Sequence, residues 1–294
     1  MKTKGIGKLW PVTEAVNIVT VLSVAVLAAA LEMSGMNSCL AAETDATQKE
    51  AAISGAPLRV GITPDYPPLV FRQSDGTTNG VEIDFAKALG QELGRPVEFV
   101  VLRRDQQIGA LVDRQIDIIM SGMSITKARQ IRISFSDPYV RNELRAIFPL
   151  KAADRFKTKE DILKTKEKIG VITGTTAEVF VKQNCTNAKI VNFTQRQDVP
   201  FYLLKGGRMD VFVDDTFALA DMFSKNEADM AYLPEALSED NLAWGIRPDD
   251  QEFLTRVNKI LGKWKADGTL DRTLNRWMPY LKNLRTQQPA GQPK

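Results

Sequence analysis

The sequence predicts an α/β protein made of two similar lobes. Stretches typical of strands alternate with stretches typical of amphipathic helices, and this alternation occurs twice, over residues 58–120 and again over 168–213. Such alternation favours parallel strands joined by helical crossovers. A chain of 294 residues is long enough for two modest α/β domains. The two series match in architecture and not in residues, so we expect two similar lobes rather than a duplicated sequence.

The first series opens with a strand and a helix. Residues 58–62 alternate apolar with small or polar side chains, and prolines follow directly. Phe85, Leu89 and Leu93 recur at helical spacing, which predicts an amphipathic helix over 81–93. The other elements expected in this series are a strand at 97–102, a short helix at 108–112 and a strand at 116–120.

The second series and the C-terminal region continue in the same way. Strands are expected at 168–172, 189–193 and 209–213, and helices at 175–183 and 199–205. Beyond them, Phe253, Val257 and Trp264 share one face of a helix, and Leu270 and Trp277 continue on a second helix after a glycine. We interpret the tryptophans of these helices as core residues.

The first 42 residues are typical of a secretory signal peptide. Lysines precede an apolar run at 16–31, and small residues follow it. That run is short of the ~20 residues that a spanning helix needs, although a retained membrane anchor stays open as an alternative. Cys39 lies in a faint lipoprotein-like motif, so lipidation is a second alternative. Residues 43–56 are expected to form a flexible tether and 286–294 a disordered tail.

Composition excludes several classes of function. The chain has no histidine, which removes Ser-His-Asp and Cys-His mechanisms and His-based zinc sites. With Cys39 and Cys185 as the two cysteines, a Cys-rich zinc site is also excluded. Cleavage after Cys39 would leave Cys185 as a free thiol, which we expect to be buried. The formal net charge of +3 is spread along the chain, so nothing favours a nucleic-acid partner.

Several short motifs occur in a fixed order along the chain. They are Leu58-Arg59-Val60-Gly61 with Tyr66-Pro67-Pro68, Gly80-Val81-Glu82-Ile83-Asp84-Phe85, Ser121-Gly122-Met123-Ser124-Ile125-Thr126 with Arg129, Phe135-Ser136-Asp137-Pro138-Tyr139, Gly174-Thr175-Thr176, Asp214-Asp215 and Lys265-Ala266-Asp267-Gly268-Thr269-Leu270. Together they resemble the periplasmic solute-binding proteins of polar amino-acid ABC importers, often called family 3. The resemblance covers residues 58–281.

This resemblance implies a fold and a function. The fold is the two-lobed type II periplasmic binding protein fold, in which two parallel or mixed sheets with flanking helices are joined by a two-crossing hinge. Lobe one is expected at 57–146 plus 243–285, and lobe two at 147–242. The function is that of an exported, periplasmic and monomeric protein that closes around an amino acid or a similar small polar solute. It delivers this solute to the membrane subunits of an ABC importer and needs no cofactor or metal.

The residues themselves suit a zwitterionic amino acid. Arg129 can grip a carboxylate with its planar fork, and Ser124 offers a hydroxyl nearby, at the carboxyl end of a predicted strand where α/β sheets bind ligands. The Gly174-Thr175-Thr176 turn opens a helix and also favours an anion, although a plain helix cap is an alternative. Asp215, after the strand 209–213, can pair with the ammonium group.

The resemblance assigns roles at this site. Arg129, Ser124 and Thr176 would bind the α-carboxylate, and Asp215 with the Gly122 carbonyl would bind the α-ammonium. Asp214 and Asp215 are adjacent on a strand and face opposite ways, and the resemblance favours Asp215 for the site. The full set of candidate ligand-binding residues is Thr63, Tyr66, Arg104, Ser121, Gly122, Ser124, Arg129, Thr173, Thr175, Thr176 and Asp215.

Two positions depart from the pattern of relatives that bind cationic amino acids. Thr63 stands where those relatives usually carry Asp, and Arg104 stands where an aromatic residue often flanks the ligand side chain. A pocket with Thr63, Tyr66 and Arg104 disfavours Lys or Arg as ligand and favours a polar or acidic side chain. An Arg104 that points to solvent is the alternative.

The competing function is enzymatic. The resemblance extends to cyclohexadienyl dehydratases, which use a carboxylate in the cleft as a general acid. Glu178 follows the Gly-Thr-Thr turn, where such a carboxylate could stand. Ordinary binders often have Glu here as a solvent-facing helix residue, so we expect a binding protein without catalytic residues.

Overall fold

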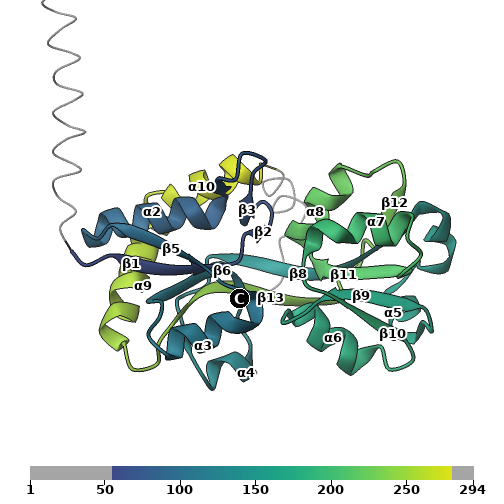
Figure 1. The fold of residues 1–294 in the computed structure, drawn as a ribbon, viewed down its shortest axis with the longest axis horizontal. Helices are drawn as coiled ribbons and strands as arrows, with labels where there is room; N and C mark the ends of the chain where they lie inside the picture. The colour runs from purple at the N-terminus through teal and green to yellow at the C-terminus, as the bar shows by residue number, and fades with distance from the viewer. Residues whose placement is uncertain (1–54, 280–294) are drawn as a thin grey trace, which may run out of the picture. The chain divides into compact units, whose positions relative to one another are not determined.

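The structure is a computed structural model that describes residues 55–279, and a mixed β-sheet runs through this part of the chain (Figure 1). Its strands are β1 (Leu58–Ile62), β5 (Val97–Val101), β6 (Ile118–Ser124), β7 (Ser134–Phe135), β8 (Val140–Pro149), β9 (Lys168–Ile172), β10 (Lys189–Phe193), β11 (Val211–Asp215), β12 (Met230–Tyr232) and β13 (Ser238–Ile246). The order is β10-β9-β11-β8-β13-β6-β1-β5, with β12 on β8 and β7 on β13. A small separate sheet holds β2 (Asp65–Tyr66), β3 (Val70–Arg72) and β4 (Thr78–Asn79).

Helices cover both faces of the large sheet. The α-helices are α2 (Val81–Leu93), α3 (Gln107–Val112), α4 (Lys127–Gln130), α5 (Lys159–Lys164), α6 (Thr176–Asn184), α7 (Val199–Leu204), α8 (Thr216–Ser224), α9 (Gln251–Ala266) and α10 (Thr269–Trp277). Three short 3₁₀ turns of the described region are η1 (Arg104–Gln106), η2 (Leu150–Arg155) and η3 (Arg196–Asp198). The parallel pairs β1–β5, β1–β6, β10–β9 and β11–β9 confirm the expected crossover architecture.

Two long strands join the halves of the sheet. β8 and β13 pair antiparallel with each other, from Ser238 opposite Leu144 to Leu242 opposite Val140. β8 also pairs with β11 of one half, and β13 with β6 of the other. Figure 1 shows both strands passing from one group of helices to the other. The two expected sheets are therefore hydrogen-bonded into one continuous path, and the two expected crossings are these strands.

Each half has its own apolar core. Around β1 and α2, the rings of Phe85, Tyr139, Trp244 and Trp264 pack together, with Phe85 stacked on Trp264 at a centroid distance of 5.8 Å. Burying rings of this size contributes on the order of 2–3 kcal/mol each, which anchors β13 and α9 to the sheet. The other half buries two smaller clusters on either face of β9 and β11.

The sequence-based bounds match closely in some elements and fail in others. The helix at 81–93 and the strand at 58–62 have the predicted ends. The strand expected at 116–120 instead spans Ile118–Ser124, and the strand expected at 209–213 instead spans Val211–Asp215. Both strands are buried along their whole length, and buried polar residues resemble a loop when only the sequence is considered. The site residues there therefore lie on strands rather than after them.

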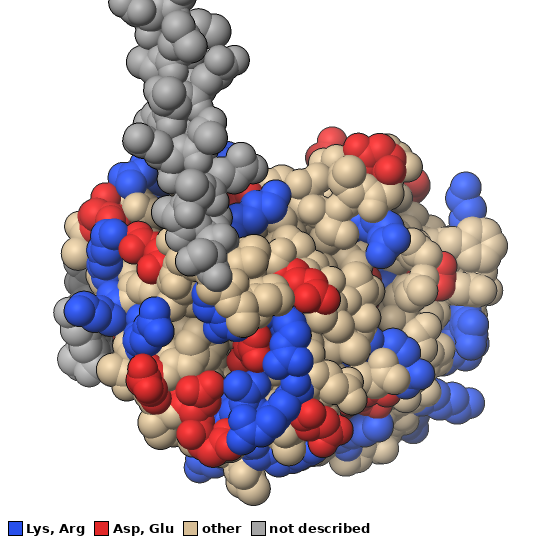
Figure 2. All heavy atoms as spheres, turned by 60° about the vertical axis from the view of Figure 1, so that its left-hand side comes forward, with Lys and Arg blue, Asp and Glu red and all other residues tan. Residues whose placement is uncertain are grey.

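Some expectations fall outside the described residues. The signal peptide at 1–42, Cys39, the tether except its last two residues, and the tail at 286–294 are in this group. Between residues 55 and 279, no helix combines the length and the apolar character needed to cross a membrane. Cys185 is buried and free, as expected, and burial raises its thiol pKa to about 11. On the face shown in Figure 2, basic and acidic side chains are intermixed, without a stripe of one sign.

Candidate functional site

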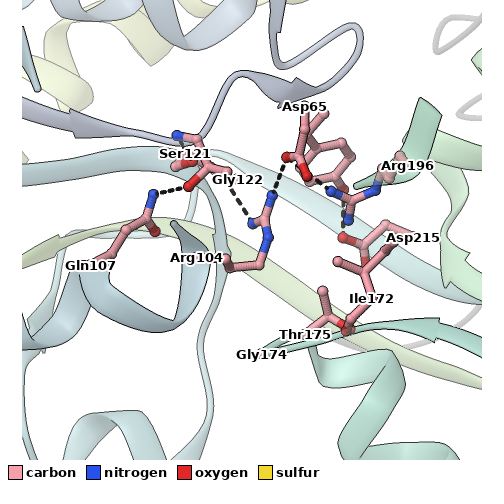
Figure 3. Close-up of polar contacts among 12 residues, drawn as sticks. Asp65, Arg104, Gln107, Ser121, Gly122, Ile172, Gly174, Thr175, Arg196 and Asp215 are labelled. Carbon is pink, nitrogen blue, oxygen red and sulfur yellow. Dashed lines mark hydrogen bonds and ion pairs between the residues drawn. The ribbon is translucent and has the colours of Figure 1, made fainter. Parts of the chain in front are cut away.

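Most of the candidate residues meet where the two halves of the sheet face each other. Tyr66 donates its hydroxyl hydrogen to Asp215 at 2.6 Å, and Arg129 donates to the carbonyl oxygen of Gly174 at 3.1 Å. Each of these bonds joins a residue of the β1–β6 half to a residue of the β9–β11 half. Figure 3 shows the side chains of both halves pointing into one region. The structure thus brings together residues that lie more than forty positions apart in sequence.

Arg129 is a cation without a carboxylate partner. Thr126 caps α4 by accepting a hydrogen bond from the Arg129 amide at 3.2 Å, which fixes the base of the side chain. The guanidinium donates to the carbonyl oxygens of Ser124 at 2.8 Å and Gly174 at 3.1 Å. Among the described residues it forms no ion pair, and burial, followed by the charge of Arg104, lowers its pKa. Because an arginine keeps its proton in proteins, this site holds a poorly hydrated positive charge.

Asp215 is the complementary anion. Its carboxylate is 5% exposed and accepts hydrogen bonds from the Tyr66 hydroxyl and from Asn142 Nδ2, both at 2.6 Å. Burial, together with the negative charges of Asp214 and Asp240, raises its pKa to about 6. Both hydrogen-bond donors are neutral, so a positive charge placed beside Asp215 would be strongly stabilised.

Asp214 has a different function from its neighbour. It is fully buried and accepts two hydrogen bonds from Arg196, from Nε at 2.6 Å and from Nη2 at 3.0 Å. This two-pronged pair neutralises Asp214 within the protein. Of the two adjacent aspartates, Asp215 is therefore the one available to a ligand cation.

The turn before α6 is built for helix capping. Gly174 has a φ of +81°, which favours glycine. Thr175 accepts a hydrogen bond from the Glu178 amide at 3.2 Å and donates to the Ile172 carbonyl at 2.6 Å, so its hydroxyl is fully engaged within the protein. Thr173 is tied to the neighbouring strand through its amide, which donates to Phe193 at 2.9 Å. Thr176 is half-buried and begins the helix, and Thr173 is half-buried as well, so these two threonines of the turn, unlike Thr175, have side chains that can face a ligand.

A buried carboxylate supports the Gly122 segment. Glu82 on α2 accepts hydrogen bonds from the Gly122 amide at 2.7 Å, the Tyr139 hydroxyl at 2.7 Å and Trp244 Nε1 at 2.9 Å. Burial raises the pKa of Glu82, while these three donors oppose that shift. Gly122 has a φ of +65°, and a Cβ there would lie 2.7 Å from the Tyr66 ring. Glu82 therefore fixes the backbone that carries the proposed ammonium acceptor.

Arg104 points inward rather than to solvent. Its side chain is 9% exposed, and it donates to Asp65 Oδ1 at 3.0 Å and to the Ser121 carbonyl oxygen at 3.4 Å. The Thr63 hydroxyl donates to the Leu102 carbonyl and accepts from Gln107, both at 2.8 Å, so it is used within the protein. Ser121 Oγ accepts from the Thr63 amide at 3.0 Å and is likewise engaged.

Comparison with known proteins assigns the family. Residues 58–280 match the family described as bacterial extracellular solute-binding proteins, family 3. The chain belongs to this family. The matched segment covers nearly all the described residues, and it contains every candidate residue of the site.

Curated relatives of this family 3 protein are amino-acid-binding proteins. The L-cystine-binding protein TcyJ of Escherichia coli (strain K12) is 29% identical over 75% of this chain and 82% of its own length. The histidine-binding periplasmic protein of the same organism is 31% identical over 83% of this chain and 95% of its own length.

Solved structures agree with the sequence comparisons. An ancestral arginine-binding protein bound to arginine superposes with a TM-score of 0.71 at 32% identity, covering 76% of this chain and 99% of that one. The ancestral amino acid-binding protein AncCDT-1, described as a precursor of cyclohexadienyl dehydratase, gives a TM-score of 0.70 at 36% identity, covering 75% and 95%. The type II periplasmic binding protein fold of this family 3 protein is thereby confirmed.

Glu178 does not have the surroundings of a general acid. Burial opposes its ionisation, but hydrogen bonds from Lys182 Nζ at 2.7 Å, the Gly174 amide at 2.8 Å and Asn192 Nδ2 at 3.2 Å bring its pKa below the ordinary value. A general acid at neutral pH needs a raised pKa and a proton to give. Here the Glu178 carboxylate is stabilised in its ionised form, and it stabilises the turn by accepting the hydrogen bond from the Gly174 amide.

Sequence patterns did not identify several residues of this site. They are Asp65, Glu82, Asn142, Arg196 and Asp240. Glu82 could have been identified from the sequence, because it shares a helix face with the apolar residues Phe85 and Leu89. A carboxylate on a buried face requires hydrogen-bond donors within the protein. No sequence pattern indicates Arg196, because it lies in a polar stretch that is typical of the surface and is buried only by tertiary packing. Within the described residues no cluster of metal-ligating side chains is arranged to hold a metal ion.

Proposed function

We propose that this protein captures a free α-amino acid between its two lobes and delivers it to an ABC importer. One observation carries the proposal. Arg129 is a buried cation with no carboxylate partner among the described residues, and Asp215 is a buried carboxylate with neutral donors only. A zwitterionic amino acid supplies the missing charge to each, because its carboxylate suits a guanidinium fork and its ammonium suits a carboxylate.

The proposed contacts follow from this pairing. Arg129 donates to the carbonyl oxygens of Ser124 and Gly174, and we propose that the side chains of Ser124 and Thr176 add donors for the α-carboxylate. The Gly122 carbonyl oxygen would accept from the α-ammonium beside Asp215. Tyr66, Arg104, Thr63 and Ser121 would line the side-chain end, with the last two acting mainly through the hydrogen bonds that hold the wall. We assign Thr175 to the support of the turn, because its hydroxyl is bonded within the protein, whereas Thr173 is tied to the neighbouring strand through its amide and keeps its hydroxyl for the ligand.

We infer that binding closes a hinge. The proposed lobes are 57–146 plus 243–285 and 147–242, and the limits between them fall within β8 and β13. Closure needs no covalent chemistry, only a ligand that binds the closed form better than the open form. Hydrogen bonds between the lobes, such as the one from Tyr66 to Asp215, support a closed arrangement as the binding form.

Export and partners complete the proposal. We place the mature chain in the periplasm, after removal of the signal peptide, as a monomer that docks on the membrane subunits of its importer. The names of relatives support this, since they include the ABC transporter arginine-binding protein 1 and the histidine-binding periplasmic protein of Escherichia coli (strain K12). We propose no enzymatic step, because Glu178 is held ionised by three donors.

A thermal-shift screen of the purified protein against the standard amino acids and prephenate tests this function. A bound amino acid present at one hundred times its Kd should stabilise the protein by about 2.7 kcal/mol. Prephenate should be recovered unchanged after incubation. The proposal fails if no amino acid raises the melting temperature, or if prephenate is converted by wild type and not by Glu178→Gln.

A further inference from the structure

Two arginines converge at the side-chain end of the site. Arg104 comes from η1 of one half and Arg196 from η3 of the other, and both donate to the same oxygen of Asp65, at 3.0 Å and 3.3 Å (Figure 3). Their side chains are 9% and 4% exposed. Their guanidinium carbons lie 5.5 Å and 4.3 Å from the centre of the Tyr66 ring. This end of the site therefore holds two desolvated positive charges around one aromatic ring.

The same contacts exclude a cationic ligand side chain. A lysine or arginine side chain would need an aromatic face or a carboxylate here. The Tyr66 ring already faces both arginines, Asp65 is shared by them, and Asp214 is bound by Arg196 through two hydrogen bonds. A third cation would have to displace one of these contacts and would then meet the remaining arginine at close range.

Arg104 is also short of acceptors. Its Nε is buried and has no hydrogen-bond partner among the described residues, and its bond to Ser121 is long at 3.4 Å. Arg196, by contrast, places two nitrogens on Asp214 at 2.6 Å and 3.0 Å. A buried donor without a partner is costly, so the site lacks an acceptor beside Arg104. In addition, the charge of Arg104 lowers the pKa of Arg129, after burial, because the two cations repel each other.

We propose that the ligand is an α-amino acid whose side chain ends in a carboxylate, and that Arg104 binds this second carboxylate through Nε and the adjacent amino group. The inference rests on the proposed function, because it extends the pocket that Arg129 and Asp215 begin. A side-chain carboxylate supplies the missing acceptor and separates the charges of Arg104 and Arg129. An amide side chain supplies an acceptor too, but its neutral oxygen makes the weaker bond.

Titration calorimetry at neutral pH provides the test, with L-glutamate and L-aspartate as probes against L-glutamine, L-asparagine, L-arginine and L-histidine. We expect at least one acidic amino acid to bind about tenfold or more tightly than its amide counterpart, since a charged acceptor makes the stronger bond to Arg104. We expect L-arginine and L-histidine to bind more weakly than both acidic probes.

Variants then locate the second carboxylate. Arg104→Gln should weaken the acidic probe about tenfold or more and change the affinity for its amide counterpart less than about threefold, because only the acid loses a charged partner. Arg103→Gln is the matched control, since this neighbouring arginine has a side chain that is 71% exposed and pairs with Asp105, and it should leave both affinities unchanged. Arg104→Lys keeps the charge and should recover part of the loss, which separates a binding role from a folding defect.

The outcomes are distinguishable. If an amide or a cationic amino acid binds more tightly than both acidic probes, the inference is wrong and the proposed function stands. If no amino acid produces heat or stabilisation, the proposed function itself fails. If an acidic amino acid binds best but Arg104→Gln and Arg104→Lys bind it as wild type does, Arg104 is not the anchor and the assignment is overturned.

Discussion

Replacing Arg129 with alanine should abolish most ligand binding. Within residues 55–279 the guanidinium donates to two carbonyl oxygens, at 2.8 Å and 3.1 Å, and pairs with no carboxylate. A ligand carboxylate bound there would be desolvated and matched by one cation. Removing that cation leaves the carboxylate buried without its partner, which costs about 2–5 kcal/mol by analogy with other buried charge pairs. This corresponds to a loss of affinity from roughly 30-fold to several thousand-fold.

Folding of the empty protein should change much less. Arg129→Ala removes two hydrogen bonds, but it also removes a poorly hydrated charge that Arg104 repels, and the two effects oppose each other. Arg129→Lys should recover part of the affinity, because an ammonium group carries the charge without the planar fork. Arg132→Ala is the matched control, since this exposed arginine lies three positions away, just beyond α4.

The assay is calorimetric titration of wild type and the three variants with the tightest-binding amino acid of the screen, alongside their melting curves. If Arg129→Ala binds within threefold of wild type, Arg129 does not hold the α-carboxylate. An equal loss in Arg132→Ala would show instead that the segment, and not the guanidinium fork, carries the effect.

Four further outcomes can be measured. The pKa of Asp215 in the ligand-free protein is raised to about 6, so affinity for an amino acid should fall roughly tenfold per pH unit below 6. The Asp215→Asn variant should lose this pH dependence. A wild-type affinity that does not change with pH would contradict the assignment of Asp215 to the ammonium group. For the same reason the free energy of unfolding of the ligand-free protein should fall as pH rises from about 4 to 6, which urea unfolding of wild type and Asp215→Asn over this range would show. Glu82→Gln should lower the free energy of unfolding by about 1–3 kcal/mol in urea, because an amide replaces the carboxylate that accepts three hydrogen bonds. Glu92→Gln, at a surface ion pair, is the control and should leave it unchanged. Equal urea midpoints for wild type and Glu82→Gln would refute the role of Glu82. Mass spectrometry of the exported protein should show loss of the first ~40 residues, and a chain that retains Met1 would rule this out.

Sequence patterns predicted the repeated α/β architecture because local periodicity determines it. The helix over 81–93 and the strands at 168–172 and 189–193 were located to the residue, since each has a clear apolar pattern and a nearby glycine or turn. β8 and β13 were not predicted as strands, because neither has one apolar pattern along its length: the first four residues of β13 are polar and exposed or half-buried, whereas its last five are buried, and β8 changes from a mixed to a mostly buried pattern. Their pairing depends on contacts almost a hundred residues apart, which no local pattern records.

At the site, the sequence motifs identified charged residues that occupy a fixed position within a motif. Arg129 and Asp215 occupy recognisable motifs, and each takes part in a hydrogen bond that joins the two halves of the sheet. Arg196 and Asn142 could not be found in this way, because their importance comes from burial and from partners distant in the chain. Thr63 and Thr175 lie near the site as expected, but the sequence could not reveal that their hydroxyls are already bonded within the protein.

If Asp215 binds the ligand ammonium as we propose, the hydrogen bond from Tyr66 to Asp215 is the contact against which that ammonium is compared. An incoming ammonium group would approach a carboxylate that already accepts a short hydrogen bond, at 2.6 Å, from the opposite half of the protein. The measured affinity is therefore a difference between two sets of contacts, and molecules that satisfy Asp215 only as well as a neutral hydroxyl does gain almost nothing there. A neutral solute would therefore gain less at Asp215 than the ammonium group of an amino acid would.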